Sequence, residues 1–205
     1  MASEFTKIAR LLFEAGMLRL TIRSHALRLY TSDRSDNIAA HSFRTALIGW
    51  FLAKSEKADP YKVFVMAALH DFPETRTGDI NWVQRAYVFE QEKKAAKEQF
   101  AGLSQGEPLL ELLLEYQEGK TLSAKLTDDA DHLDQLILQK EHAHTGNREA
   151  ELWLHLDDFE NSCQAYKSLH TESARKLAKE IVNQEPGEWC NNLWIKKKRK
   201  LGNPQ

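Results

Sequence analysis

Apolar residues recur along most of this chain at the three- and four-residue spacing of amphipathic helices. Near the N-terminus, Phe5, Ile8 and Leu12 share one side of a helix that we expect over residues 4–15. No segment alternates apolar and polar residues for long enough to predict a sheet, so the fold class is predicted to be all-α. The same spacing predicts further helices over about 39–56, 60–72, 82–100, 123–144, 148–166 and 170–184, and one that begins near Pro108.

Two of these helices have clear boundary signals. Residues 31–38 are rich in Ser, Asp and Asn, so we expect a loop whose end caps the helix that follows. From Ala46 to Ala53 that helix is almost wholly apolar, which predicts that it is buried. Pro60 suits the first turn of the next helix, and this helix should end one or two residues before Pro73, which lacks a backbone donor.

The composition is typical of a single globular domain. Of 205 residues, 42% are hydrophobic and 28% charged, and the small numbers of Gly (9) and Pro (5) favour long helices. We expect one domain over residues 1–185 and a basic, flexible tail over 186–205, which includes the basic run 196–200. The charged run within 82–100 predicts a solvated helix face. The 28 basic and 30 acidic residues nearly balance, so no nucleic-acid partner is expected.

The sequence indicates a cytoplasmic protein. The cysteines, Cys163 and Cys190, are too few and too far apart for a disulfide framework, which suits a reducing compartment. The N-terminal segment lacks the pattern of a signal peptide, and no apolar run approaches the roughly 20 residues of a membrane span. We therefore expect neither secretion nor a membrane partner.

The candidate chemistry begins with histidines and carboxylates at the ends of apolar helices. His41 lies near the start of one such helix, where by itself it is more often a capped or core histidine than a ligand. His70 and Asp71 end the apolar run of another, and Glu74 follows. Because a buried carboxylate is costly without compensation, either a salt bridge or a divalent cation is expected near Asp71.

A third signal is an acidic cluster in the predicted helix 123–144. Asp128 and Asp129 are explained by the preference for acidic residues near a helix N-terminus. Asp131 instead lies among apolar residues that we expect to be buried, so it needs a partner. Asp134 follows three positions later on a similar face of the helix.

Together, His41, His70–Asp71 and Asp131 resemble the H…HD…D pattern of the HD-domain metal-dependent phosphohydrolases. The resemblance spans residues 16–147, and its most specific part is HDFPE followed by TGD. The order and spacing are similar to those of the subgroup that contains bacterial 5′-deoxyribonucleotidases. This resemblance implies a compact all-α HD-domain helical bundle and a homodimer, for which an apolar last helix offers an interface.

The resemblance also implies residue roles. One divalent ion, whether cobalt, manganese, magnesium, zinc or iron, is held by His41, His70, Asp71 and Asp131. Glu74 serves as general base, or as proton donor to the leaving oxygen, with a solvated helix-start carboxylate as the alternative. Arg23 positions the phosphate, although Arg19 and Arg28 lie close enough in sequence to compete. Asp79 accepts hydrogen bonds from substrate hydroxyls, unless it is only a turn residue.

The implied reaction removes the 5′-phosphate from a (deoxy)nucleoside monophosphate by attack of metal-bound water. A deoxynucleoside triphosphate triphosphohydrolase and a non-catalytic nucleotide-binding module are the alternatives. Two departures from the subgroup bear on this expectation. Ala40 stands where Glu usually precedes the first histidine, which removes an acceptor that would orient His41. Asn81–Trp82 stands where Pro is usual and changes the nucleoside pocket.

Overall fold

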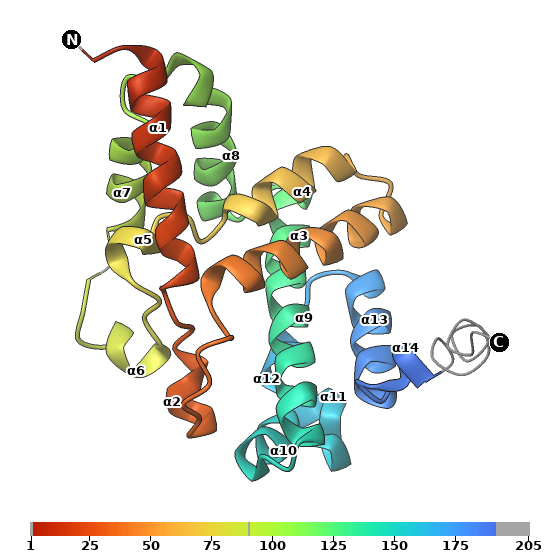
Figure 1. The fold of residues 1–205 in the computed structure, drawn as a ribbon. Helices are drawn as coiled ribbons and strands as arrows, with labels where there is room; N and C mark the ends of the chain where they lie inside the picture. Colours follow the sequence, from red (N-terminus) through yellow and green to blue (C-terminus); the bar gives the residue numbers. More distant parts are fainter. Residues whose placement is uncertain (1, 90, 192–205) are drawn as a thin grey trace, which may run out of the picture.

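The computed structural model describes residues 2–89 and 91–191. These residues form helices joined by short connections and contain no strand, only an isolated bridge between Ile22 and Asn37. The all-α prediction is therefore confirmed (Figure 1). The basic run predicted at 196–200 lies outside the described residues.

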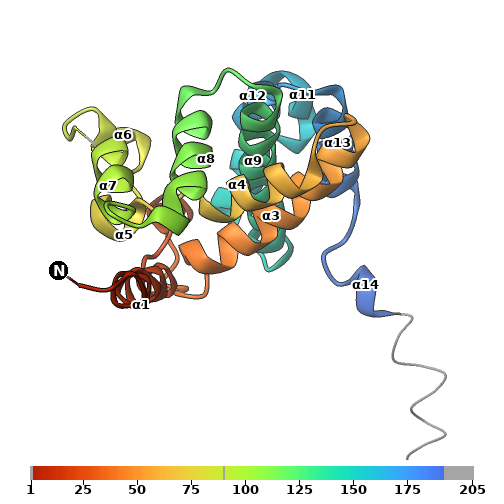
Figure 2. The same ribbon diagram turned by 90° about the horizontal axis from the view of Figure 1, so that it is seen from above.

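Three helices form the centre of the molecule: α3 (Ile38–Ser55), α4 (Pro60–Leu69) and α9 (Leu122–His144). In Figure 1, α9 crosses behind the pair α3 and α4, and Figure 2 shows α1, α5, α6, α7 and α8 on one side of this centre and α11 to α13 on the other. The remaining α-helices are α1 (Glu4–Ala15), α2 (His25–Leu29), α5 (Glu74–Thr77), α6 (Trp82–Arg85), α7 (Glu92–Gln99), α8 (Glu107–Glu118), α10 (Arg148–Leu154), α11 (Phe159–Ser162), α12 (Gln164–Ser168), α13 (Glu172–Asn183) and α14 (Glu188–Asn191). Short 3-10 turns occupy Gly16–Arg19, Ser104–Gly106 and Leu156–Asp158.

Small residues let the three central helices approach closely. A Cβ atom added at Gly49 would lie 3.0 Å from Val63 Cγ1, 3.6 Å from Ala67 Cβ and 3.8 Å from Ala130 Cβ. All four positions are buried, and large apolar side chains such as Leu126 fill the core around them. This contact packs the second half of α3 against α4 and against the middle of α9.

Local signals fix where these central helices begin and end. The side chain of Asn37 accepts from the backbone N–H of Ala40 and caps α3, and Asp59 caps α4 ahead of Pro60. The helix α4 ends at Leu69, slightly earlier than predicted, and a turn leads to α5. The predicted ends of α1 and α9 agree with the structure to within one residue.

Two predicted helices are broken in the structure. The expected helix over 82–100 consists of α6 and α7, separated by a segment that includes Tyr87 and Phe89, both 87% exposed. These aromatic residues form helices poorly and here have no core to cover them. The expected helix over 148–166 breaks at His155, which adopts a left-handed conformation with φ 51°.

The explanation of Asp128 and Asp129 by a helix N-terminus is wrong, because α9 begins at Leu122 and both residues lie well inside it. Asp129 is instead buried and accepts hydrogen bonds from the backbone N–H groups of His170 and Thr171, at 2.6 and 3.0 Å. This carboxylate therefore ties the start of α13 to the centre of the bundle.

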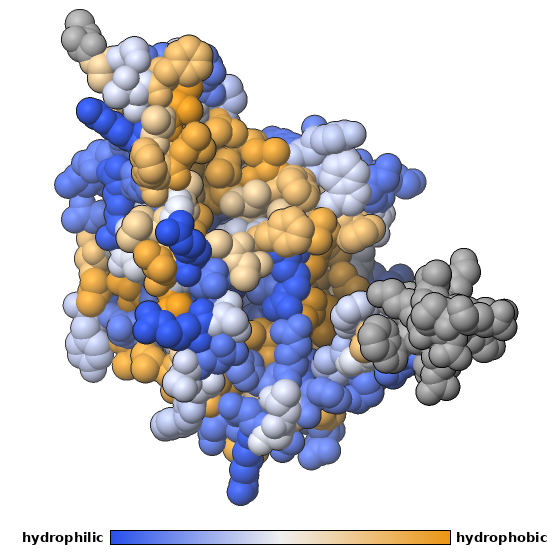
Figure 3. All heavy atoms as spheres, in the orientation of Figure 1, coloured by the Kyte–Doolittle hydropathy of each residue, from blue (hydrophilic) through white to orange (hydrophobic). Residues whose placement is uncertain are grey.

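The prediction that residues 46–53 are buried holds for only one side of α3. Leu47 and Phe51 are 41% and 65% exposed, and with Phe43 they form an outward apolar stripe. Figure 3 shows apolar side chains gathered on this face and along α1, whereas the apolar residues of α13 pack against the core. The homodimer stays a prediction. The outward apolar faces are those of α1 and α3, and sedimentation equilibrium tests whether two chains associate.

None of the described helices has the length and apolar character needed to cross a bilayer.

Candidate metal centre

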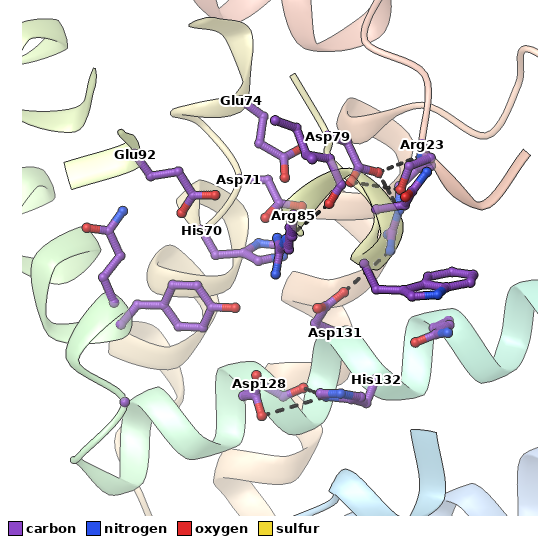
Figure 4. Close-up of a pocket in the computed structure, with 18 of the residues that line it drawn as sticks. Arg23, His70, Asp71, Glu74, Asp79, Arg85, Glu92, Asp128, Asp131 and His132 are labelled. Carbon is purple, nitrogen blue, oxygen red and sulfur yellow. Dashed lines mark hydrogen bonds and ion pairs between the residues drawn. The ribbon is translucent and has the colours of Figure 1, made fainter. Parts of the chain in front are cut away.

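The fold brings His41, His70, Asp71 and Asp131 together. His41 is in the first turn of α3, His70 and Asp71 directly follow α4, and Asp131 is in the middle of α9. The Nε2 atom of His41 lies 3.2 Å from His70 Nε2, 3.3 Å from Asp71 Oδ2 and 3.2 Å from Asp131 Oδ1. His70 Nε2 lies 3.2 Å from Asp71 Oδ2. In Figure 4, the side chains of His70, Asp71 and Asp131 face the same cavity.

The ligand atoms of His41, His70 and Asp71 lie close enough to one another to hold one small divalent ion, and Asp131 Oδ1 meets this group at His41 Nε2. Ligand atoms at about 2.0–2.2 Å from a common metal are about 3–3.5 Å from one another in octahedral or tetrahedral geometry. The four distances above, 3.2 to 3.3 Å, all lie in this range. Two imidazoles and two carboxylates also suit several first-row divalent ions, so the donor set fits without selecting one metal.

The hydrogen bonds of the two histidines point their free nitrogens at the same place. His41 Nδ1 lies 2.6 Å from Asp134 Oδ2, and His70 Nδ1 lies 2.7 Å from the carbonyl oxygen of Ala67. Each Nδ1 therefore donates a hydrogen bond, so Nε2 is the ring nitrogen that could bind a metal once it carries no proton. Although burial opposes it, Asp131, Asp134 and Asp71 raise the pKa of His41 well above its ordinary value. The carboxylates around His41 therefore favour a positive charge at this cluster, whether a proton or a metal ion.

Asp134 supplies the hydrogen-bond acceptor that orients His41, which the alanine at position 40 cannot supply. Its carboxylate is buried, and it contacts both His41 Nδ1 and the guanidinium of Arg44. Arg44 also donates to both carboxylate oxygens of Glu141, at 2.9 and 3.1 Å. The sequence placed Asp134 on a similar face of the helix as Asp131, but its role follows only from the crossing of α3 and α9.

Removal of this acceptor is expected to weaken metal binding. We expect Asp134→Ala to raise the Kd for Mn²⁺ about 10- to 100-fold, because His41 loses the group that fixes its orientation and tautomer. Titration calorimetry on metal-free protein measures this change. Asp128→Asn is the matched control on the same helix, because Asp128 pairs with His132 and His170 rather than with the four ligands. Equal Kd values for Asp134→Ala and the native protein would contradict the assigned role.

Glu74 opens α5, as predicted, and its side chain lies beside the metal-ligand cluster (Figure 4). It is only 7% exposed, and its Oε2 atom has no hydrogen-bond partner in the described part of the chain. Burial and the nearby charges of Asp71 and Asp79 raise the pKa of Glu74 to about 10. In the metal-free protein this carboxyl group therefore carries a proton at neutral pH.

Among the three candidate arginines, Arg23 is the one that reaches the cluster. It is 6% exposed, with Nη2 3.6 Å from Asp131 Oδ1, and its buried Nε has no hydrogen-bond partner among the described residues. Arg19 lies outside the lining of the cavity. Arg28 pairs with Glu149 at 2.5 Å and also lies outside the lining. Arg23 is thus placed to meet an anion beside the metal ligands.

Asp79 anchors the segment that carries Arg23. Its carboxylate accepts from the backbone N–H of Ser24 at 2.7 Å and from the Ser24 hydroxyl at 3.0 Å. The side chain is 14% exposed and lines the same cavity as the metal ligands. It therefore has a structural role at the wall of this cavity.

A cavity of about 1100 Å³ opens from this cluster. Sequence reasoning did not identify several of its polar and aromatic lining residues, because they come from segments far apart in the chain. They include His25, Arg85, Lys93, Tyr116, Lys125, His132, Trp153 and His170. Tyr116 packs its ring edge-on against His70, with centroids 5.5 Å apart.

Comparison with known proteins identifies similar chains. A family model described as the HD domain matches residues 15–183. A conserved hypothetical protein from Pyrococcus furiosus is 27% identical, with a TM-score of 0.65 over 86% of this chain and 99% of that one. A protein from Pyrococcus horikoshii is 25% identical, with a TM-score of 0.63 over 85% and 98%. A structure described as a predicted metal-dependent phosphohydrolase from Magnetospirillum magnetotacticum is 24% identical, with a TM-score of 0.64 over 89% and 95%. No curated protein sequence matches.

Proposed function

The chain belongs to the HD-domain family, and on this premise we propose that it is a metal-dependent phosphohydrolase that removes the 5′-phosphate from nucleoside monophosphates, preferably deoxynucleotides. The observation that carries the proposal is that His41, His70 and Asp71 have ligand atoms close enough together to share one ion, with Asp131 Oδ1 3.2 Å from His41 Nε2. Beside them lie a buried arginine and a protonated glutamate, in a cavity large enough for a nucleotide.

In this proposal His41, His70, Asp71 and Asp131 hold one divalent ion. Such an ion, when bound, lowers the pKa of a coordinated water and withdraws charge from a phosphoryl group. The protein contributes the orientation of its ligands through Asp134 and the exclusion of bulk water by the buried walls of the site.

Arg23 binds and orients the phosphate. Its guanidinium is buried and faces the carboxylates of Asp131 and Asp79, so it is held in place before a substrate arrives. A phosphate that enters beside these residues would receive hydrogen bonds from a donor that needs little rearrangement. Asp79 accepts hydrogen bonds from the sugar hydroxyl of the same substrate.

Glu74 transfers the proton that the hydrolysis requires. Hydrolysis breaks the bond between phosphorus and the 5′-oxygen, and that oxygen must gain a proton while the attacking water loses one. Because the pKa of Glu74 is raised to about 10, its carboxyl group is ready to donate to the leaving oxygen. A bound cation would lower this pKa, since nearby positive charge favours the carboxylate, and would let Glu74 accept a proton from water.

The size of the cavity favours a second candidate, a triphosphohydrolase that acts on deoxynucleoside triphosphates. Its volume of about 1100 Å³ exceeds the usual range of small-molecule pockets, and Lys93 and Lys125 line it. Both reactions use the same metal site and differ in product: orthophosphate from the monophosphate, tripolyphosphate from the triphosphate.

The experiment is a panel of nucleoside mono- and triphosphates, incubated with purified protein and Mn²⁺, Co²⁺ or Mg²⁺ and analysed for released products. We expect orthophosphate from deoxynucleoside monophosphates and none after removal of metal by a chelator. Release of tripolyphosphate would favour the second candidate. Nucleotide binding without any hydrolysis would contradict both and favour a non-catalytic module.

A further inference from the structure

Two tryptophans from distant segments meet in the cavity. Trp82 is the first residue of α6 and Trp153 belongs to α10, and both line the cavity that contains the metal ligands. Their ring centroids are 6.4 Å apart, with planes inclined at 54°. Trp82 is 60% exposed, which leaves much of its apolar ring in contact with solvent. An exposed indole inside a polar cavity is a surface on which a planar ligand can stack.

Local structure holds Trp82 in this position. The side chain of Asn81 accepts from the backbone N–H groups of Val83 and Gln84, at 2.9 and 3.0 Å, and Gln84 Oε1 accepts from Asn81 N–H at 3.1 Å. This capping box fixes the short helix that carries the indole. The Asn81–Trp82 pair therefore both caps the helix and supplies its aromatic ring.

The side chain of Trp153 is held more rigidly than that of Trp82. The His25 ring packs edge-on against it, with centroids 5.3 Å apart and an interplanar angle of 83°. The guanidinium of Arg28 lies 5.7 Å from the centroid of the same ring and is itself tied to Glu149 at 2.5 Å. These contacts fix Trp153, so a ligand that enters between the two indoles would displace Trp82 rather than Trp153.

The pair lies within a nucleoside's length of the phosphate-binding residues. Trp82 follows Asp79 by three positions, so their Cα atoms are at most about 11 Å apart. His25, which touches Trp153, follows Arg23 by two positions. A substrate with its phosphate at Arg23 and its sugar at Asp79 therefore carries its base toward the tryptophans.

We propose that Trp82 and Trp153 form a base-stacking subsite that holds the purine or pyrimidine ring of the substrate. This inference rests on the proposed function and adds the part of the site that recognises the base. A ring held between two parallel rings needs about 7 Å between them, close to the present 6.4 Å, and because the planes are now inclined at 54° the exposed Trp82 side chain has to rotate for a base to enter. Stacking accepts every base, so binding should follow ring size, with purines tighter than pyrimidines.

The first test uses a nucleoside, which lacks phosphate and binds without hydrolysis. Deoxyadenosine added to the metal-free protein should quench tryptophan fluorescence, and Trp82→Ala should raise its Kd about 10-fold, as loss of one stacking partner does. Tyr87→Ala is the control, because Tyr87 is an even more exposed aromatic residue nearby in the chain, at 87% against 60% for Trp82, and does not line the cavity. Trp153→Phe keeps an aromatic wall and should weaken binding less than Trp82→Ala.

The second test compares deoxyadenosine 5′-phosphate with 2-deoxyribose 5-phosphate, which has no base. The ratio of their kcat/KM values should fall about 10-fold in Trp82→Ala and stay constant in Tyr87→Ala. Equal deoxyadenosine binding by the native and Trp82→Ala proteins would overturn the subsite. Base-dependent fluorescence quenching without phosphate release from any nucleotide would overturn the hydrolase proposal and leave the subsite standing.

Discussion

Replacement of Asp131 by asparagine is expected to weaken the binding of Mn²⁺ more than 100-fold and to abolish phosphate release. The substitution keeps the size of the side chain but exchanges an anionic oxygen ligand for a neutral amide oxygen. The remaining ligands, His41, His70 and Asp71, then carry one negative charge in place of two. Titration calorimetry on the metal-free variant measures the affinity, and an orthophosphate assay measures the activity.

The control for this prediction is again Asp128→Asn, one turn earlier on α9. It makes the same chemical change on the same helix and lines the same cavity, but its partners are His132 and His170. Circular dichroism should show native helical content for both variants. If Asp131→Asn bound Mn²⁺ as tightly as Asp128→Asn, Asp131 would not be a metal ligand.

Glu74→Gln should lower kcat about 10²- to 10⁴-fold, as loss of a positioned acid or base does, and leave the metal affinity close to native. The amide keeps the shape of the side chain but cannot exchange a proton. Steady-state kinetics with a saturating deoxynucleotide measure the first effect, and calorimetry measures the second. A variant with native kcat would exclude Glu74 from proton transfer.

The same substitution has a distinct signature in stability. The raised pKa of Glu74 means that the folded, metal-free protein binds a proton more tightly than the unfolded chain between about pH 4.5 and about pH 10. Its contribution to stability therefore falls as pH rises through this window. Glutamine removes that penalty, so at pH 8 the metal-free variant should unfold at a higher temperature than the native protein, with a difference that shrinks toward pH 4.5. An unchanged difference across this range would contradict the raised pKa.

Much of the fold could be predicted from the sequence because its central helices have strong local signals. The capping residue Asn37 and the proline at position 60 locate the starts of α3 and α4, and the histidine and aspartate pattern identifies the four residues that converge. The breaks after Arg85 and at His155 were missed, because whether a marginal segment stays helical depends on what covers it.

The missed parts of the site share one property, which is that they depend on contacts between distant segments. The contact of Asp134 with His41 exists only because α9 crosses α3, and the pairing of Trp82 with Trp153 joins α6 to α10. Periodicity along one helix carries no information about which residue of another helix it meets. Asp134 and Trp82 were both visible in the sequence, but only as an acidic neighbour and as a departure from similar sequences.

The most direct test of the metal centre is anomalous X-ray diffraction from crystals soaked in Mn²⁺. We expect one anomalous peak per chain, about 2.0–2.3 Å from His41 Nε2, His70 Nε2 and carboxylate oxygens of Asp71 and Asp131. A fully soaked crystal with no peak among these four side chains, or with its only peak elsewhere on the protein, would contradict this expectation.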